Sequence, residues 1–299
     1  MNAERSENII CFGEVLWDMI PGGKKPGGAP LNVAIHLKRM GKNPTVISKD
    51  GNDALGRELK QFMAENGLDT QYIATDPNLK TSEVIVQLDE NKNATYEICE
   101  PVAWDNIVLT DEIKKLPSPA DIIIFGSLAQ RNKTTRETLL HLVENSDVIK
   151  LPDVNLRPPY DSPQIFEELL HLSDFVKLND EELALVSSWN GKSGSDRNVT
   201  KWLAEFYNCN TVCVTRGEKG ALLFTGGVFF EHHGFKVKAV DTVGAGDSFL
   251  AALVSTLFKG ENPQKAIEFA CAVGAFVASQ SGAVPEYSVA EINWIMQNV

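Results

Sequence analysis

The chain has 299 residues, a hydrophobic content of 43% and a formal net charge of −12 at pH 7. This length suits one large α/β domain, or one domain with a small appendage, and the apolar content is that of an ordinary globular protein. The acidic balance and the lack of any basic run argue against nucleic acid and against anionic membranes as partners.

Hydropathy and cysteine usage indicate where the protein works. No apolar run approaches about 18 residues and no apolar segment follows Met1, so we expect neither a membrane span nor a signal peptide. The cysteines number five, and Cys11, Cys213 and Cys271 lie in apolar segments, as buried free thiols do. Cys209 also lies near Cys213, but no second Cys/His pair has metal-ligand spacing. These features predict a protein of the reduced cytoplasm.

The first part of the chain predicts strands and helices followed by a hairpin. Pro21 to Gly28 is rich in turn residues, and its lysines, Lys24 and Lys25, are expected to be solvated. No helix of useful length separates the two hairpin strands, which predicts a small antiparallel appendage. The expected elements are strand 8–12, an extended segment 15–20, helix 31–40, strand 45–48, helix 54–66, and strands 83–88 and 94–99 joined by 89–93.

After Pro101 the chain alternates strands and helices, which predicts a doubly wound α/β sheet. Ligands of such sheets bind at the carboxyl ends of the strands. Polar residues follow the predicted strands, so one sheet edge can present them together: Asp18, Asp153, Asn155, Arg157, Asn179, Glu182, Gly217 and Asp247. The expected strands are 121–125, 148–151, 175–178, 211–214, 221–224, 228–231 and 235–240, and the expected helices are 133–145, 164–172, one opening at 179–182, 200–206, one after 247, 263–279 and 289–296.

The glycine-rich stretch Gly244-Ala245-Gly246-Asp247 joins a predicted strand to a predicted helix. Glycines allow close backbone approach to a ligand, and a helix N-terminus offers free N–H donors and the positive end of a dipole, so this stretch predicts an anion site. Asp247 should be ionised there and can take a proton from a hydroxyl while the cradle holds a phosphoryl group. Local chemistry alone supports equally well a helix cap with a plain turn.

Two common nucleotide-binding motifs are absent from the sequence. Gly191-Lys192-Ser193 resembles the end of a Walker A loop, but Val186 stands where its first glycine is needed. The segment after the first predicted strand lacks the glycine pattern of a Rossmann fingerprint. Any nucleotide must therefore bind in another way.

Two separated stretches, residues 27–34 and 241–249, resemble the N-terminal and C-terminal signatures of the ribokinase-like (PfkB-type) sugar kinases. Gly13 and Asp18, Asn179-x-x-Glu182 and Thr215-x-Gly217-x-x-Gly220 follow in the family's order. The resemblance covers the whole chain. It implies a single domain, 1–299, built as a three-layer α/β/α sandwich with a mostly parallel central sheet, and a small β-strand lid from about 14–28 and 83–104.

The resemblance also implies catalytic and sugar-binding roles. Asp247 would be the general base, and the N–H groups of Gly244, Ala245 and Gly246 would form the anion hole. Asp18, Gly28 and Asn32 would bind sugar hydroxyls, for which a carboxylate and an amide are suitable partners. The alternative for Asp18 and Asn32 is ordinary turn and helix-start chemistry.

The cofactors implied by the resemblance are ATP, Mg²⁺ and a potassium ion. Asn179 and Glu182 would order Mg²⁺ and its waters, since magnesium takes few protein ligands; the alternative is that both residues only start a helix. Asp241 and the carbonyl of Val243 match the family's loop for a monovalent cation. The residues expected along ATP are Thr215, Gly217, Gly220 and Gly282.

Several segments look most like the fructokinase branch of the family, among them Gly28-Ala29-Pro30-x-Asn32 and Asp153-x-Asn155-x-Arg157. Arg157 would contact the sugar or the transferred phosphoryl group, the alternative being a surface salt bridge. The resemblance thus implies an ATP-dependent kinase that converts fructose to fructose 6-phosphate. Kinases for ribose, 2-keto-3-deoxygluconate or a nucleoside remain alternatives, as does a catalytically silent sugar-binding regulator. A homodimer through the lid strands would cover their exposed edges.

Overall fold

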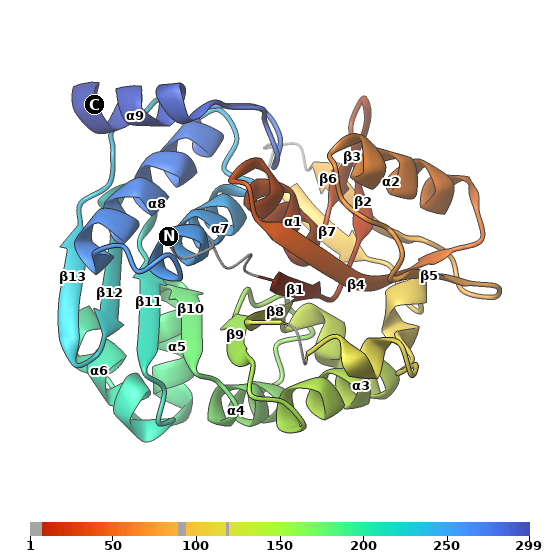
Figure 1. Ribbon diagram of the computed structural model, residues 1–299, viewed down its shortest axis with the longest axis horizontal. Coiled ribbons are helices and arrows are strands. Elements are labelled where there is room, and N and C mark those ends of the chain that lie inside the picture. Colours follow the sequence, from red (N-terminus) through yellow and green to blue (C-terminus); the bar gives the residue numbers. More distant parts are fainter. Residues whose placement is uncertain (1–7, 89–93, 118–119) are drawn as a thin grey trace, which may run out of the picture.

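The computed structural model describes residues 8–88, 94–117 and 120–299. A long twisted sheet runs through the molecule between two helical layers, and a smaller sheet lies beside one end of it (Figure 1). The long sheet contains, in spatial order, β13 (Val228–His232), β12 (Ala221–Thr225), β11 (Thr211–Thr215), β10 (Phe175–Asn179), β9 (Ile149–Asp153), β8 (Ile122–Gly126), β1 (Asn8–Phe12), β4 (Asn43–Gly51) and β5 (Ile73–Asp76). From β11 to β5 the neighbours pair in parallel, whereas β12 and β13 are antiparallel.

Helices cover both faces of the long sheet (Figure 1). One layer holds α1 (Ala29–Arg39), α2 (Ala54–Glu65), α7 (Ala245–Leu257), α8 (Pro263–Ala278) and α9 (Val289–Asn298). The other holds α3 (Lys133–Glu144), α4 (Pro163–His171), α5 (Asp180–Trp189) and α6 (Asp196–Phe206). The predicted α/β/α sandwich is therefore confirmed. None of the helices in the described part of the chain is long and apolar enough to cross a bilayer.

Strand β8 shows why a continuous apolar run becomes a central strand. Successive side chains of a strand point to opposite faces of a sheet. Ile122 and Ile124 accordingly pack into the core beneath the α1/α7/α8 layer, whereas Ile123 and Phe125 pack into the core beneath α3. A parallel strand covered by helices on both sides needs apolar residues at every position, which is what this segment supplies.

The smaller sheet has the order β3-β2-β6-β7 and consists of β2 (Leu16–Ile20), β3 (Gly23–Gly27), β6 (Ser82–Leu88) and β7 (Ala94–Ile98). It overlaps the ranges expected for the lid, while the connection 89–93 lies outside the described residues. The predicted antiparallel hairpin is confirmed, because β6 and β7 pair in antiparallel fashion. Strand β2 pairs with β6 in parallel, so the small sheet as a whole is mixed.

Residues 21–28, which are rich in turn residues, form a turn only at their start. Pro21 and Gly22 complete the turn, with Gly22 at φ 94°, and the chain returns at once as β3. Proline followed by a glycine with positive φ is typical of a compact type II turn. The lysines of β3 are not merely solvated: Lys24 pairs with Glu58 and lies 4.7 Å from the centroid of a Trp17 ring, and Lys25 contacts a distant loop.

Two further segments differ from the prediction. Residues 235–240 form no strand in the described structure, although they alternate: Phe235 is buried, but the segment pairs with no strand. Instead, the N–H groups of Val240 and Asp241 both donate to the carbonyl of Ala278 at the end of α8. The short strand β5 was not expected, because only its first and last residues are buried.

Candidate active site

The carboxyl ends of the parallel strands meet the N-termini of α1 and α7. Asp247 lies in the first turn of α7 and Asn32 in the first turn of α1. Asn32 Nδ2 donates to Asp247 Oδ2 over 2.8 Å. Two residues separated by 215 positions thus meet, as expected for a general base and a residue that binds the sugar.

The environment of Asp247 raises its pKa to about 6. The surrounding protein desolvates the carboxylate, and the charge of Asp153 adds to the effect, while the Asn32 hydrogen bond, Lys177 and Arg157 oppose it. The helix N-terminus was expected to hold the carboxylate ionised, but desolvation is the larger effect. A pKa near 6 still leaves Asp247 mostly ionised at neutral pH and places it in the range suited to a general base.

Gly244 is the N-cap of α7 and adopts φ 78°, in the left-handed region. A Cβ atom here would lie 2.5 Å from the backbone of Ala283, so only glycine allows this close approach. The first turn of α7 contains Ala245 and Gly246, whose N–H groups have no partners within the helix. Ala245 N donates to the carbonyl of Thr242 over 3.2 Å, a long bond.

A buried ion pair lies beneath the glycine turn, and the sequence analysis missed it. Lys177 Nζ donates to Asp153 Oδ1 over 2.8 Å, and a Cβ atom at Gly246 would lie 3.2 Å from Lys177 Nζ. Burial alone would lower the pKa of Lys177, but Asp153, Glu182 and Asp247 together raise it. The ammonium is therefore a fixed positive charge next to the anion cradle. The available signal was a lysine within the apolar run 175–178.

Glu14 is a second residue that the sequence analysis did not assign to the site. Its side chain follows β1, is buried, and its Oε2 has no hydrogen-bond partner among the described residues. Burial raises its pKa to about 7, the charge of Asp247 acts in the same direction, and Arg157 opposes both. An acidic residue directly after a buried strand was the signal that could have identified it.

The small sheet brings Asp18 and the double glycine to the same region. A Cβ atom at Gly28, which has φ 108°, would lie 2.4 Å from the carbonyl oxygen of Glu14. A Cβ at Gly27 would lie 2.6 Å from Asp18 Oδ2, so the carboxylate of Asp18 lies directly over the glycines. Burial raises the pKa of Asp18 to about 6, against the charge of Arg157.

Arg157 is exposed, and its Nη1 donates to the neighbouring carbonyl of Leu156 over 3.0 Å. Its charge nevertheless opposes the rise in the pKa values of Glu14, Asp18 and Asp247. The guanidinium therefore faces the acidic cluster from the solvent side, where it can meet an incoming anion.

The sequence of the chain was compared with models of known protein families. The model of the pfkB family of carbohydrate kinases matches residues 3–288. The chain belongs to this family. It is therefore a phosphotransferase that acts on a sugar hydroxyl. Asn32 and Asp247, which meet in the site, come from the two stretches that resemble the family's signatures.

The similarity to individual relatives extends over the whole fold of this kinase. Probable fructokinase-7 of Arabidopsis thaliana is 30% identical, over 93% of this chain and 88% of its own length. The structure of Vibrio cholerae fructokinase with fructose, ADP and calcium is 26% identical, with a TM-score of 0.84 over 98% of this chain and 100% of that one. A double mutant of that enzyme is described with fructose, ADP and potassium. Aminoimidazole riboside kinase of Salmonella enterica, with its riboside and an ATP analogue, is 25% identical, with a TM-score of 0.80 over 98% and 100% of the two chains.

Asn179 and Glu182 of the kinase form a reciprocal cap at the start of α5. Asn179 Oδ1 accepts from Glu182 N, and Glu182 Oε2 accepts from Asn179 N, each over 2.8 Å. Glu182 Oε1 accepts from Leu156 N over 2.9 Å. Both carboxylate oxygens are thus occupied by backbone donors, which is the helix-start alternative considered from sequence.

The residues expected along ATP have different surroundings. Thr215 ends β11 beside Asn179 of β10. Gly217 has φ 55°, and a Cβ atom added there would meet nothing within 4 Å, so its backbone is open to a ligand. Gly220 is buried, and a Cβ there would lie 2.0 Å from the carbonyl oxygen of His232. Gly220 is therefore required for packing next to β13, whatever its relation to the nucleotide.

Asp241 is the centre of the loop before α7. Its Oδ1 accepts from Val243 N over 3.1 Å and its Oδ2 accepts from Gly282 N over 3.0 Å. Lys25 Nζ lies 3.5 Å from Asp241 Oδ2 and donates to Ser281 Oγ over 3.0 Å. The residues predicted to hold a potassium ion therefore share their carboxylate with an ammonium group from the small sheet.

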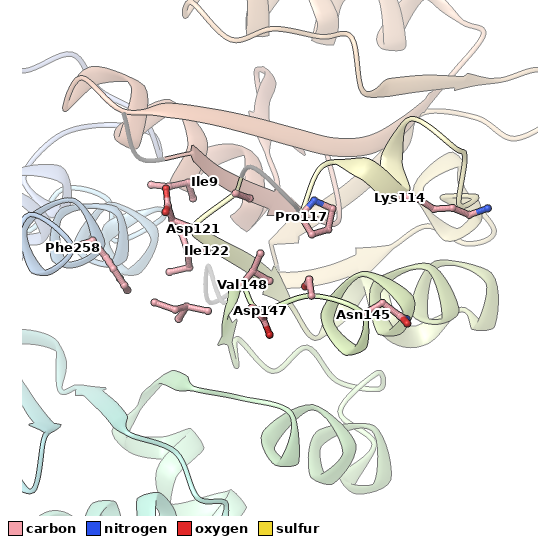
Figure 2. A pocket seen from close by; sticks show the side chains of 12 residues that line it. Ile9, Lys114, Pro117, Asp121, Ile122, Asn145, Asp147, Val148 and Phe258 are labelled. Atoms are coloured by element: carbon pink, nitrogen blue, oxygen red, sulfur yellow. The ribbon is translucent and has the colours of Figure 1, made fainter. Parts of the chain in front are cut away.

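A cavity of about 690 Å³ lies at the opposite edge of the long sheet. Figure 2 shows Ile9, Ile122 and Val148 around it, at the amino ends of β1, β8 and β9. The polar residues that meet at Asp247 are at the carboxyl ends of the strands. The cavity is therefore not part of the candidate active site.

Proposed function

We propose that this kinase transfers the γ-phosphoryl group of ATP to the terminal hydroxyl of fructose and releases fructose 6-phosphate and ADP. The observation that carries the proposal is the Asn32–Asp247 pair beside the glycine turn of α7. The fructose and ADP of the Vibrio cholerae relative support the choice of substrates.

The pair defines the first step of the reaction. Asn32 occupies Asp247 Oδ2, and no donor among the described residues occupies Oδ1, so Oδ1 can accept the hydroxyl proton. The hydroxyl oxygen then bonds to the γ-phosphorus, the bond from this phosphorus to the β–γ bridging oxygen breaks, and ADP leaves. The first-turn N–H groups of α7 and the nearby Lys177 ammonium stabilise the charge on the transferring group.

Sugar recognition would involve residues of the small sheet, of the start of α1 and of the loop that follows β9. We assign Asp18, Gly28 and Asn32 to the sugar hydroxyls and Arg157 to the sugar or the phosphoryl group. The positions of Asp18 over the glycines and of Arg157 opposite the acidic cluster support these roles. The small sheet would close over the sugar as a lid and exclude water. Its edge strands, β3 and β7, are the surface through which we expect a homodimer to form.

The nucleotide site that we propose includes a magnesium ion. Asp153 Oδ2 is buried and has no hydrogen-bond partner within the described residues, and its charge reaches Glu182 and Asp247. An orphaned carboxylate oxygen beside the cradle fits an ion that is held mainly by phosphates and water. When bound, Mg²⁺ would neutralise phosphate charge; Asp153, Asn179 and Glu182 are the residues proposed to order its waters. The residues that we propose to contact ATP are Thr215, Gly217, Gly220 and Gly282.

A second candidate substrate is a nucleoside, since the similar Salmonella enterica enzyme binds a riboside. Ribose and 2-keto-3-deoxygluconate are further candidate substrates, and the substrate panel described below includes both. A silent regulator is disfavoured because Asp247 and the glycine turn are both in place. The free thiols of all five cysteines support a cytoplasmic location.

The test is coupled ADP release with Mg-ATP across fructose, tagatose, glucose, ribose, 2-keto-3-deoxygluconate and adenosine. The proposal expects the highest kcat/KM for fructose and its loss in Asp247→Ala. Selective turnover of another substrate would keep the mechanism and replace the sugar. No turnover with any of them, despite ligand-induced stabilisation, would support the silent regulator.

A further inference from the structure

Lys25 connects the small sheet to the loop that precedes the anion cradle. It lies on β3, directly opposite Asp18 of β2, and its ammonium reaches Asp241 and Ser281, more than two hundred residues away in the sequence. A Cβ atom at Gly282 would lie 3.6 Å from Lys25 Nζ, so the ammonium packs closely against this loop.

The surroundings of Lys25 match those of a bound monovalent cation. Two carboxylates face it, since its charge lowers the pKa of Asp18 and its nitrogen lies 3.5 Å from Asp241 Oδ2. The hydroxyl of Ser281 supplies a neutral oxygen. The Lys25 ammonium neutralises part of the negative charge that would attract a cation to Asp241.

The residues present therefore do not fit the potassium ion that the family resemblance implies. Both oxygens of Asp241 already accept backbone N–H groups from Val243 and Gly282, and the approach to Oδ2 is shared with an ammonium. We propose that the Lys25 ammonium is a built-in substitute for the monovalent cation of this loop, so that the kinase works without potassium. The proposal rests on the proposed function for its ADP-binding and activity readouts, whereas the response of the thermal midpoint to potassium does not depend on it.

The chain offers a matched control on the same strand. Lys24 precedes Lys25 and points to the other face of β3, where it contacts Glu58 and Trp17. Lys24→Met removes one charge from the same strand without touching Asp241. Lys25→Arg keeps a positive charge at the loop, and Lys25→Met removes it.

The first experiment measures two quantities for the wild type and each variant: the affinity for ADP, by calorimetry, and the midpoint of thermal unfolding. Both are measured in potassium chloride and in tetramethylammonium chloride at equal ionic strength. For the wild type and Lys24→Met, we expect ADP dissociation constants that agree within about twofold between the two salts. For Lys25→Met, we expect about tenfold weaker ADP binding in tetramethylammonium, with recovery and a raised thermal midpoint in potassium. Lys25→Arg should lie between them.

Two results would overturn the inference. One is a wild type that needs potassium for ADP binding, a measurement that requires no variant. The other is a Lys25→Met protein that responds to potassium no more than the wild type does. Because these readouts need no sugar, they hold even if the substrate panel shows no turnover, and ADP release with the best sugar then repeats the comparison as a rate.

Discussion

Asn32 Nδ2 lies 2.8 Å from Asp247 Oδ2, and this hydrogen bond joins the first turn of α1 to the first turn of α7. The amide nitrogen occupies one oxygen of the carboxylate, and no donor among the described residues occupies the other. The same bond stabilises the ionised carboxylate and opposes the rise in its pKa. One contact thus leaves a single oxygen of the proposed base free and limits the rise in its pKa.

Removal of the base should abolish turnover and leave the fold intact. General base catalysis contributes typically about 10²–10⁴-fold, so Asp247→Ala should lose at least about 10²-fold in kcat. Because desolvation raises the pKa of Asp247, its charge costs stability, and the variant should unfold at no lower temperature. The measurements are steady-state ADP release and thermal unfolding. Residual kcat above a tenth of wild type, in a folded variant, would assign the proton to another group.

The pH dependence of kcat/KM should show an acidic limb near pH 6. The ionised form of Asp247 is the active base, and its pKa is raised to about 6, so activity should fall as the pH drops below that value. Asp18 and Glu14 titrate in a neighbouring range, with pKa values raised by burial to about 6 and about 7.

The Asn32→Ala variant distinguishes these groups. Its amide lowers the pKa of Asp247, and its loss should move the limb to higher pH. The limb is measured as kcat/KM for the best sugar between pH 5 and pH 8.5, with Glu14→Gln in parallel. A limb that moves in Glu14→Gln and stays fixed in Asn32→Ala would show that Glu14, and not Asp247, controls activity.

The sequence predicts the parts of the site that depend on topology. Parallel strands present their carboxyl ends at one edge, so Asp153 and Asn179 could be expected to approach one another from strand ends alone. Asp18 instead lies within β2 of the small sheet, and Asp247 follows no strand. The glycine turn before α7 was likewise evident, because the glycines and the apolar helix that follows them each have a local signature. These predictions needed no knowledge of which side chains touch.

The parts that the sequence does not reveal depend on long-range packing. Lys177 looks like an interruption of an apolar strand until Asp153 is placed beside it on the neighbouring strand. Lys25 looks like a turn residue until β3 pairs with β2 and carries it to Asp241. Residues 235–240 alternate like a strand, but they pair with no strand in the described structure, and alternation cannot show this.

The close approach of Gly244 to Ala283 should make this glycine irreplaceable. Gly244→Ala combines a positive φ with a Cβ that would lie 2.5 Å from backbone atoms, so the loop must shift. We expect a loss of about 1–3 kcal/mol in stability and at least about tenfold in kcat. Gly260→Ala is the matched control, since Gly260 has φ 77° but nothing within 4 Å of its added Cβ. Equal effects in the two variants, measured by denaturation and kcat, would leave backbone strain as the whole explanation.

Glu14 should make the kinase less stable as the pH rises. Its pKa is 4.5 in an ordinary setting and is raised to about 7 by burial, so the folded state binds the extra proton between these values. The stability that this group contributes is therefore full below pH 4.5 and is lost as the pH rises through 7. Glu14→Gln keeps the shape without the charge, and relative to wild type it should gain roughly 1–3 kcal/mol between pH 5 and pH 8. Urea denaturation of both proteins at the two pH values measures this difference, with exposed Glu144→Gln as the control. A Glu14→Gln protein whose stability changes with pH as much as that of wild type would mean that Glu14 is charged in the folded state at both pH values, and its unpartnered oxygen would then require a cation or a donor that binds there.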